Sequence, residues 1–175
     1  NPRLELEKAH KVKTCSYYKV SNDKIYFSET SVVNEIIYIP RGYTVIFKMG
    51  TRLFFKNNSG IISHSPIIMN GSKSHPIEIS GEENCQGMHI IQAGGGSILN
   101  WAQFKGLNTL KYKGWELTGA VTFYESDVEI KNCIFEKNNC EDALNIIRSK
   151  FEISESLIQK TFADGLDGDF CEGSI

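Results

Sequence analysis

Short hydrophobic segments alternate with turn-forming residues along most of the chain. From residue 24 onward, β-branched and aromatic residues gather in short runs, which is the pattern expected of strands. Glycine, asparagine, proline and serine separate the runs, and these residues favour turns. The clearest runs lie at residues 24–27, 35–39, 44–47, 52–55, 60–62, 67–69 and 77–79. The pattern predicts an all-β protein, but a β-sandwich would produce it as well as a solenoid would.

An internal repeat favours the solenoid. Residues 126–130 (SDVEI) and 149–153 (SKFEI) match at an offset of 149 − 126 = 23. Residues 142–145 (DALN) and 164–167 (DGLD) match at 164 − 142 = 22. Coils of nearly equal length place equivalent residues on neighbouring parallel strands, about 4.8 Å apart. The repeat therefore predicts a right-handed parallel β-helix.

Three pairs of apolar residues are expected to stack inside this β-helix. Each pair is related by the offset of 23, so that its members lie on successive coils and cover one another. The pairs are Val128 with Phe151, Ile130 with Ile153, and Ile134 with Leu157.

The repeat also predicts how the chain is divided. Residues 1–24 are charge-rich and are expected to form an N-terminal cap, either an edge strand or a short helix. Residues 25–175 supply the coils of a single domain. Residues 105–119 interrupt the repeat and are expected to leave the stack as a loop. Residues 173–175 fall in what looks like the middle of a coil, from which we expect a truncated stack and a longer parent protein.

Charge and hydropathy argue against two classes of partner. The 175 residues contain 19 Lys and Arg against 21 Asp and Glu, a net charge of −2. Such a chain has no general basic field that would hold nucleic acid. No apolar run approaches the roughly 20 residues that a membrane-spanning helix needs. We therefore expect no nucleic-acid partner and no membrane span.

Cysteine and histidine spacing does not indicate a structural metal site. The five cysteines lack the CxxC or Cys/His spacing of zinc ligands. Cys133 and Cys140 could share a coil, so a disulfide between them stays open as an alternative. His64, His75 and His89 have no partner at ligand spacing and are expected at the surface or in turns.

Several motifs resemble one known superfamily. Residues 39–42 (IPRG), 70–71 (NG) and 75–79 (HPIEI) resemble the opening coils of bacterial right-handed parallel β-helix repeat proteins. Residues 141–145 (EDALN) and 164–170 (DGLDGDF) look like the Asp-rich rungs of secreted members of that pectate-lyase-like superfamily. The resemblance implies the fold and an extracytoplasmic or secreted location.

The same resemblance implies no particular reaction. The superfamily includes pectate lyases, polygalacturonases and alginate epimerases, together with members of unassigned activity, and a shared fold does not determine function. The chain lacks a lyase-like arginine-centred cluster, an adjacent Asp-Asp pair and an Asp-Pro-His motif. No catalytic role is therefore carried over from these enzymes.

The densest group of carboxylates comes from two successive coils. If Leu144 and Leu166 point inward, strand alternation directs Asn145 and Asp167 outward together, and Asp169 follows on the same face. We expect these polar side chains to form one surface patch. The acidic residues of the two coils are Glu141, Asp142, Asp164, Asp167, Asp169 and Glu172.

Three roles are open for these carboxylates. Stacking places Asp142 over Asp164 at about 5 Å, near the carboxyl separation of retaining glycosidases, so that these two and Asp167 are candidate catalytic residues. Asp164, Asp167 and Asp169 are candidate ligands of calcium, because a cation would relieve their repulsion. The third role is structural, since Asp and Asn at corners satisfy backbone N–H groups.

Residues near the acidic patch and in the excursion are candidates for binding. Asn145 belongs to the patch, and Arg148 could neutralise it or grip a sugar carboxylate, although a surface salt bridge is the simpler role. Tyr112 and Trp115 lie in the excursion and could stack on sugar rings. Trp101 falls within a strand motif and is expected in the core.

Three functions fit these features. The first is an extracytoplasmic β-helix module that binds a polysaccharide or cell-surface glycan through its Asp-rich face. The second is a glycoside hydrolase or polysaccharide lyase that uses the stacked carboxylates. The third is a purely structural segment of a larger surface protein, in which these residues hold only turns or calcium.

Overall fold

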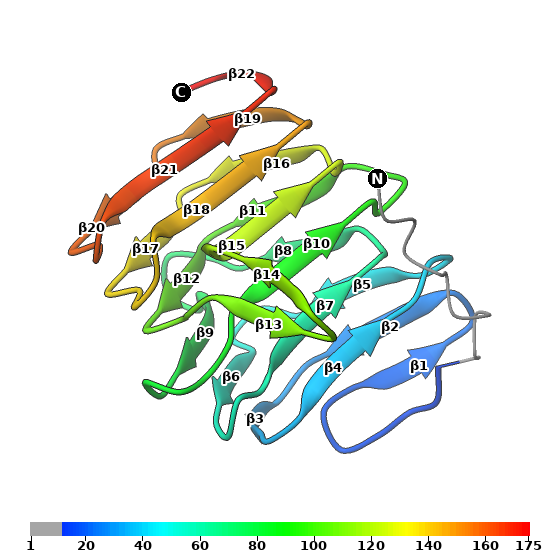
Figure 1. Ribbon diagram of the computed structural model, residues 1–175. Helices are drawn as coiled ribbons and strands as arrows, with labels where there is room; N and C mark the ends of the chain where they lie inside the picture. The colour runs from blue at the N-terminus through cyan, green and yellow to red at the C-terminus, as the bar shows by residue number, and fades with distance from the viewer. Residues whose placement is uncertain (1–11) are drawn as a thin grey trace.

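The computed structural model describes residues 12–175, and this part of the chain is a parallel β-solenoid of about seven turns without a helix (Figure 1). Six successive turns each contribute one strand to each of three sheets, and β1 and β22 extend the first sheet at its two ends. The all-β class and the parallel stacking predicted from the repeat are confirmed. The right-handed sense, which almost all parallel crossovers share, stays a prediction.

Three sheets form the walls of the solenoid. The first sheet contains, in spatial order, β1 (Lys19–Ser21), β2 (Lys24–Phe27), β5 (Thr44–Phe47), β8 (Ile67–Asn70), β11 (Ser97–Asn100), β16 (Val128–Lys131), β19 (Lys150–Ser154) and β22 (Glu172–Ser174). The second contains β3 (Thr30–Val33), β6 (Arg52–Phe55), β9 (Ile77–Gly81), β12 (Ala102–Lys105), β17 (Ile134–Glu136) and β20 (Leu157–Gln159). The third contains β4 (Ile36–Ile39), β7 (Gly60–Ser63), β10 (Met88–Ile91), β15 (Gly119–Tyr124), β18 (Asp142–Ile147) and β21 (Asp164–Asp169).

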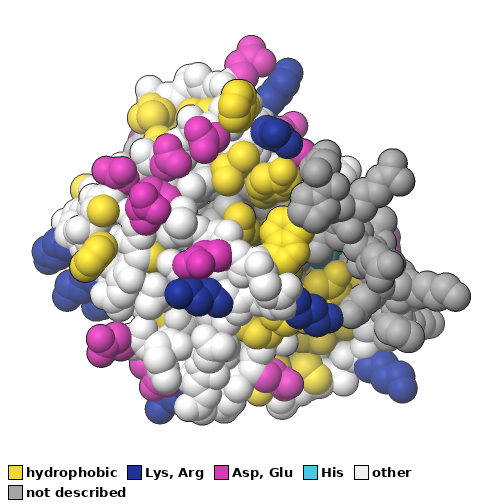
Figure 2. All heavy atoms as spheres, in the orientation of Figure 1, with side chains coloured by type: hydrophobic (Ala, Val, Ile, Leu, Met, Phe, Trp, Pro, Cys, Tyr) yellow, Lys and Arg dark blue, Asp and Glu magenta, His cyan; other side chains and the backbone are white. Residues whose placement is uncertain are grey.

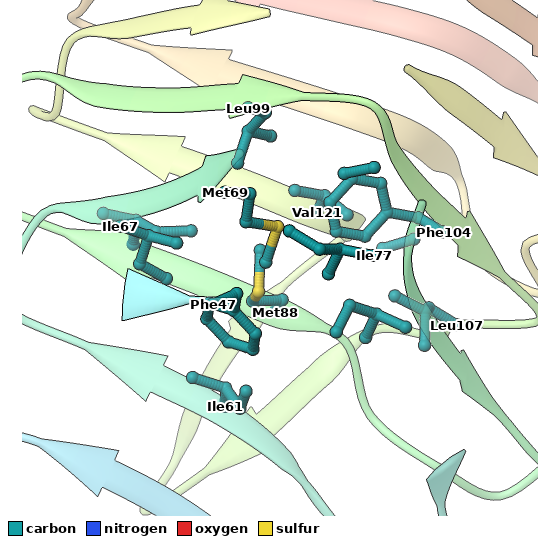
Figure 3. Packing of buried hydrophobic residues seen from close by; sticks show 14 of the residues in the cluster. Phe47, Ile61, Ile67, Met69, Ile77, Met88, Leu99, Phe104, Leu107 and Val121 are labelled. Atoms are coloured by element: carbon teal, nitrogen blue, oxygen red, sulfur yellow. The ribbon is translucent and has the colours of Figure 1, made fainter. Parts of the chain in front are cut away.

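Side chains from all three sheets meet in one apolar core along the axis. Figure 3 shows Met69 of β8, Ile77 of β9 and Met88 of β10 pointing toward one another, and all three are fully buried. Each strand alternates inward apolar positions with outward ones, as β6 does with buried Leu53 and Phe55. Because every turn covers its neighbour's apolar positions, the core is continuous from coil to coil.

Two of the three predicted stacks lie in the core. Val128 pairs with Phe151 and Ile130 with Ile153, and all four contribute to the core. The third stack is in register but faces outward, since Leu157 is 47% exposed. The prediction that Ile134 and Leu157 lie inside is wrong, because the next residues along β17 and β20, Phe135 and Ile158, occupy the interior instead.

Corner residues explain a second correction. Trp101 was expected in the core but lies between β11 and β12, half-buried, with a φ of +53°. A positive φ turns the chain sharply at this point, so the one-residue corner replaces a continuous strand. The equivalent corner of the next coil contains Asn132, also at +53°.

The predicted N-terminal cap, residues 1–24, is described only in part. Residues 1–11 of the predicted cap lie outside the described residues. Within the remainder of the cap, β1 pairs antiparallel with β2, which agrees with an edge strand at this end of the first sheet.

All five cysteines are free thiols, so the alternative of a Cys133–Cys140 disulfide is wrong.

The excursion is a β-hairpin rather than an irregular loop. Its strands are β13 (Leu110–Tyr112) and β14 (Trp115–Leu117), and it lies across the outer face of the third sheet (Figure 1). Leu110 packs there against Ile62 of β7 and Ile91 of β10, which point away from the solenoid axis. The hairpin therefore buries a second, smaller apolar cluster outside the coils.

Residues 12–175 contain no helix with the length and apolar character that crossing a membrane would require.

Candidate functional site

The predicted polar residues meet on the outer face of β18 and β21. Parallel pairing places Asp142 beside Asp164 and Asn145 beside Asp167. The same register places Ile147 beside Asp169, whose side chain is exposed. Figure 2 shows acidic side chains gathered over these two strands. We name Asp142, Asn145, Asp164, Asp167 and Asp169 the acidic patch.

One amide joins the two coils of the patch. The Asn145 side-chain Nδ2 donates to Asp142 Oδ2 at 3.0 Å and to Asp167 Oδ2 at 3.4 Å. Thr118 Oγ1 donates to the same Asp142 oxygen at 3.0 Å. Asp142 and Asn145 are buried, at 2% and 4% exposure, whereas Asp167 is half-buried. The patch is therefore anchored at its inner side by hydrogen bonds and open at its outer side.

A glycine makes room for this arrangement. A Cβ atom at Gly119 would lie 2.7 Å from Asn145 Cβ and 2.8 Å from Thr122 Oγ1. Real Cβ atoms do not approach other atoms so closely, so any other residue here would displace the Asn145 side chain. Gly119 begins β15 beside Asp142, and its lack of a side chain positions the shared amide.

In the described part of the chain, no basic side chain forms an ion pair that would balance the charge of the patch. Burial raises the pKa of Asp167, and the negative charges of Asp142, Asp169 and Asp164 raise it further, although a hydrogen bond from the Gly168 backbone opposes them. Asp167 therefore holds a proton more readily than an ordinary aspartate does.

Arg148 does not neutralise the patch. Its Nη1 lies 3.4 Å from Glu125 Oε1 and 3.4 Å from the Tyr124 hydroxyl. The guanidinium carbon lies 5.9 Å from the centre of the Phe170 ring, which is 87% exposed. The surface salt bridge expected for this arginine is present, and its role in gripping a sugar carboxylate stays a prediction.

The predicted aromatic platform lies farther along the same face. Tyr112 and Trp115 pair at the tip of the hairpin, and Tyr112 packs against the cluster formed by Ile62, Ile91 and Leu110. The strands under this cluster, β7 and β10, are three to four strand positions from β21, a separation of about 14–19 Å. The structure thus places the aromatic residues and the acidic patch on one sheet face without direct contact.

No ready metal centre exists in the described part of the chain. Among residues 12–175, no three His, Cys, Asp or Glu side chains converge to hold a metal ion. A calcium ion at Asp164, Asp167 and Asp169 would therefore take several of its oxygen ligands from backbone carbonyls or water. Calcium binding at these three residues stays a prediction.

A melting experiment tests calcium binding. If the ion binds the native patch, the melting temperature should rise between micromolar and millimolar calcium, because a ligand of the native state stabilises it. Asp167→Asn should blunt the rise, whereas Glu152→Gln, a distant and exposed carboxylate on β19, should leave it unchanged. A melting temperature that does not respond to calcium would contradict calcium binding. The aspartates would then keep only their structural role at the coil corners.

Two histidines that were expected at the surface are buried. His64 Nδ1 lies 2.8 Å from the Ile91 carbonyl oxygen, and its ring is 3% exposed. His89 points outward from β10, between core residues Met88 and Ile90, yet it is 0% exposed. For His89 the expectation was wrong because the hairpin covers the outer face of β7 and β10. His64 is buried because it packs against the Tyr38 ring, with 5.5 Å between the ring centres. Sequence spacing shows neither contact. His75 is exposed, as expected.

His89 begins a buried polar column that leads to the patch. His89 pairs with Thr122 of β15, and Thr122 pairs with Asn145. Among residues 12–175, both ring nitrogens of His89, Thr122 Oγ1 and Asn145 Oδ1 find no hydrogen-bond partner. Each unpartnered buried group costs about 1–3 kcal/mol. Burial alone lowers the pKa of His89 to about 3, so the ring is neutral.

Sequence reasoning missed Thr118, Thr122 and His89 as neighbours of the patch. The coil offset contained a signal for Thr122, because 145 − 122 = 23 places it beside Asn145. Thr118 and His89 had no comparable signal. The excursion of residues 105–119 breaks the repeat there, and the fold of that excursion determines both environments.

The hairpin is held by a glutamine that precedes β10. Gln86 Nε2 donates to the Lys111 carbonyl oxygen at 3.1 Å, and the Lys111 backbone N–H donates to Gln86 Oε1 at 3.2 Å. Gln86→Ala removes both bonds and should speed amide hydrogen exchange at residues 110–117 about tenfold. Gln159→Ala, which removes a bond to Glu136 on the second sheet, is the control. Equal exchange in both variants would show that Gln86 does not hold the hairpin.

Comparison with known proteins gives no relative: no family model, no curated protein and no solved structure matches the chain.

Proposed function

We propose that the chain is an extracytoplasmic β-helix module that binds a polysaccharide along the outer face of its third sheet. The observation that carries this proposal is the acidic patch, in which Asn145 links the carboxylates of Asp142 and Asp167 on successive coils. Ordered carboxylate and amide groups offer the hydrogen bonds that sugar hydroxyls need. The hydrogen bonds of Asn145 and Thr118 hold part of this set in place before a ligand arrives.

The length of the face supports a chain-like ligand. The strands β7 and β10, over which Tyr112 packs, lie about 14–19 Å from β21 of the acidic patch in the same sheet. A single sugar cannot span this distance, whereas an oligosaccharide laid along the stack can reach both. The exposed Phe170 ring beside the patch provides another apolar surface for a sugar.

Binding to a panel of hexasaccharides tests the proposal. The panel contains neutral, acidic and amino-sugar hexamers, and the affinity is measured by calorimetry. Asp167→Asn should weaken the tightest interaction about tenfold, because one charged hydrogen-bond acceptor is lost. Glu152→Gln makes the same charge change on another sheet and should have no effect. A complete lack of binding, or equal loss in both variants, would contradict the proposal.

The alternative function is that of a glycoside hydrolase or polysaccharide lyase. The direction of the pKa shift at Asp167 favours it, because a general acid needs a pKa raised above that of an ordinary carboxyl, and Asp142 and Asp164 contribute to this shift. Release of reducing sugar, or the absorbance of unsaturated products, from the same panel would establish turnover. Binding without either product assigns the chain to the binding module.

A purely structural role is the third outcome. In that case Asp167→Asn changes stability and no glycan binds, because the carboxylates serve only the backbone and the coil corners.

A further inference from the structure

The hairpin on the outer face of the third sheet is built separately from the coils. Its strands, β13 and β14, pair with each other as a two-stranded sheet and with no other strand of residues 12–175. Each strand has only three residues, and an isolated two-stranded hairpin is at best marginally stable in water. The hairpin therefore depends on its contacts with the sheet below it.

Two kinds of contact hold the hairpin on that sheet. The Gln86 side chain makes two hydrogen bonds with the Lys111 backbone, at 3.1 and 3.2 Å. Leu110 packs against Ile62 and Ile91, and all three side chains are buried. The strand below, β10, is instead paired with β7 and β15 in the parallel ladder of the third sheet. Lifting the hairpin would break the contacts of Gln86 and Leu110 but none of the ladders that join the coils.

His89 gives this covered face a group that acid can charge. Its side chain is fully buried, and its two ring nitrogens have no hydrogen-bond partner among residues 12–175. Its neighbours on the adjoining strands are Ile62 and Thr122, neither of which ionises. A charged ring in this site would lose its hydration without gaining a partner of opposite charge. Protonation of His89 therefore requires a state in which water reaches the ring.

The described residues supply His89 with no compensating charge. Burial is the only cause that lowers the pKa of its ring, to about 3. Lys111 and Glu116 pair with each other at 3.4 Å and are exposed, and the tyrosine hydroxyls gain no charge in acid. Burial lowers the pKa of His64 as well, so this second histidine needs its own control. The titratable groups on the elements around His89 are His64 after β7, Tyr124 of β15, Lys111 and Tyr112 of β13, Lys113 of the turn and Glu116 of β14.

We infer that the hairpin is an acid-sensitive cover, which lifts from the third sheet as His89 takes up a proton and exposes the apolar cluster beneath it. Lifting lets the ring regain its hydration, so protonation stabilises the open form relative to the closed form. The inference does not depend on glycan binding, although an open hairpin would also carry Tyr112 and Trp115 away from the proposed binding face.

The size of the response follows from the two states of the ring. In the open form the ring has the pKa of an ordinary histidine, about 6.5, whereas burial lowers this pKa to about 3 in the closed form. Between these values the open form binds the proton and the closed form does not. The ratio of open to closed hairpin should therefore rise about 50- to 100-fold from pH 6.5 to about pH 4.5.

Native-state hydrogen exchange tests the cover. Exchange at residues 110–117 is compared with exchange at residues 97–100 of β11, a core strand of the first sheet, and each rate is corrected for the intrinsic effect of pH. The protection of the hairpin amides should be lower than that of β11 and should depend only weakly on urea, because local opening exposes little surface. It should fall about 50- to 100-fold from pH 6.5 to about pH 4.5.

Substitutions of single groups assign the response to His89. His89→Leu removes the ionising ring and should reduce the fall in protection to less than about threefold, and His89→Gln is a second neutral variant in case leucine disturbs the fold. His64→Gln and Glu116→Gln should keep the response of the parent. Gln86→Ala should lower the protection of the hairpin at both pH values and keep its pH dependence, because it weakens the closed form without changing the ring.

Several outcomes would overturn the inference. Hairpin amides with the protection and urea dependence of β11 would show that the hairpin opens only when the whole solenoid unfolds. Protection that does not change with pH would show that opening takes up no proton. A response of parent size in His89→Leu and His89→Gln, or its loss in His64→Gln or Glu116→Gln, would assign the acid sensitivity to another group.

Discussion

Replacing Ile130 by alanine should lower the free energy of unfolding by about 2–5 kcal/mol. Ile130 is fully buried and lies in one interior stack between Leu99 of the preceding coil and Ile153 of the next. Parallel strands on both sides fix the backbone here, so the structure cannot collapse around the missing atoms. Chemical denaturation measures the change, and the slope with denaturant should stay the same.

Leu157→Ala is the matched control for this prediction. Leu157 also lies in a stack between coils, but its side chain faces outward and is 47% exposed. A surface substitution of this kind should change stability by no more than about 0.5 kcal/mol. Similar losses in the two variants would contradict the assignment of inward and outward positions.

Acidification should destabilise the protein through His89. The pKa of this ring is about 3 in the folded chain because of burial, and it is near 6.5 when the chain is unfolded. Between these values the unfolded state binds the proton and the folded state does not, so stability falls as the pH falls. The slope is about 1.4 kcal/mol per pH unit, which gives a loss of about 3 kcal/mol between pH 6.5 and about pH 4.5.

His89→Leu isolates this contribution. Leucine removes two unpartnered buried nitrogens and should raise stability at neutral pH by about 1–3 kcal/mol. The variant should also be less sensitive to acid than the parent by about 3 kcal/mol over the same range, while His64 and the carboxylates contribute equally to both proteins. Parallel pH profiles of the parent and the variant would contradict the burial of His89.

The repeat in the sequence predicted the solenoid because the offset between matching segments equals the number of residues in one coil. An offset of 23 requires Ile130 and Ile153 to be neighbours in any parallel stack, and they are. The orientation of Ile134 and Leu157 could not be read in the same way. Each is followed by another apolar residue, Phe135 or Ile158, so the sequence alternation allows either member of the pair to face inward.

The acidic patch was predictable to the same extent. Alternation from Leu144 correctly placed Asn145 beside Asp167, since both follow inward leucines by one residue. Alternation alone did not predict that Asp142 shares the Asn145 amide. The ladder pairs Gly119 with Asp142 and Val121 with Leu144 but omits the residues between them, so the regular register is interrupted at this point of β18.

The surroundings of the patch depended on contacts that no repeat encodes. Arg148 was a reasonable partner for the aspartates by sequence distance, but the stack places it beside Glu125 of the preceding coil. The burial of His89 results from a hairpin whose residues lie about 20–30 positions later in the chain. Both facts make the patch more negative and its inner edge more buried than the sequence indicated.

Amide chemical shifts during a glycan titration test the central claim most directly. The tightest-binding hexamer of the panel should shift the Asn145 side-chain amide and the Gly168 backbone amide, because both contact Asp167. The Gln103 side-chain amide, on the outer face of the second sheet, should stay unchanged. Saturable shifts at Asn145 and Gly168 alone would place the glycan on the acidic patch. Shifts at Gln103, with Asn145 and Gly168 unmoved, would contradict the account and move the binding surface to the second sheet.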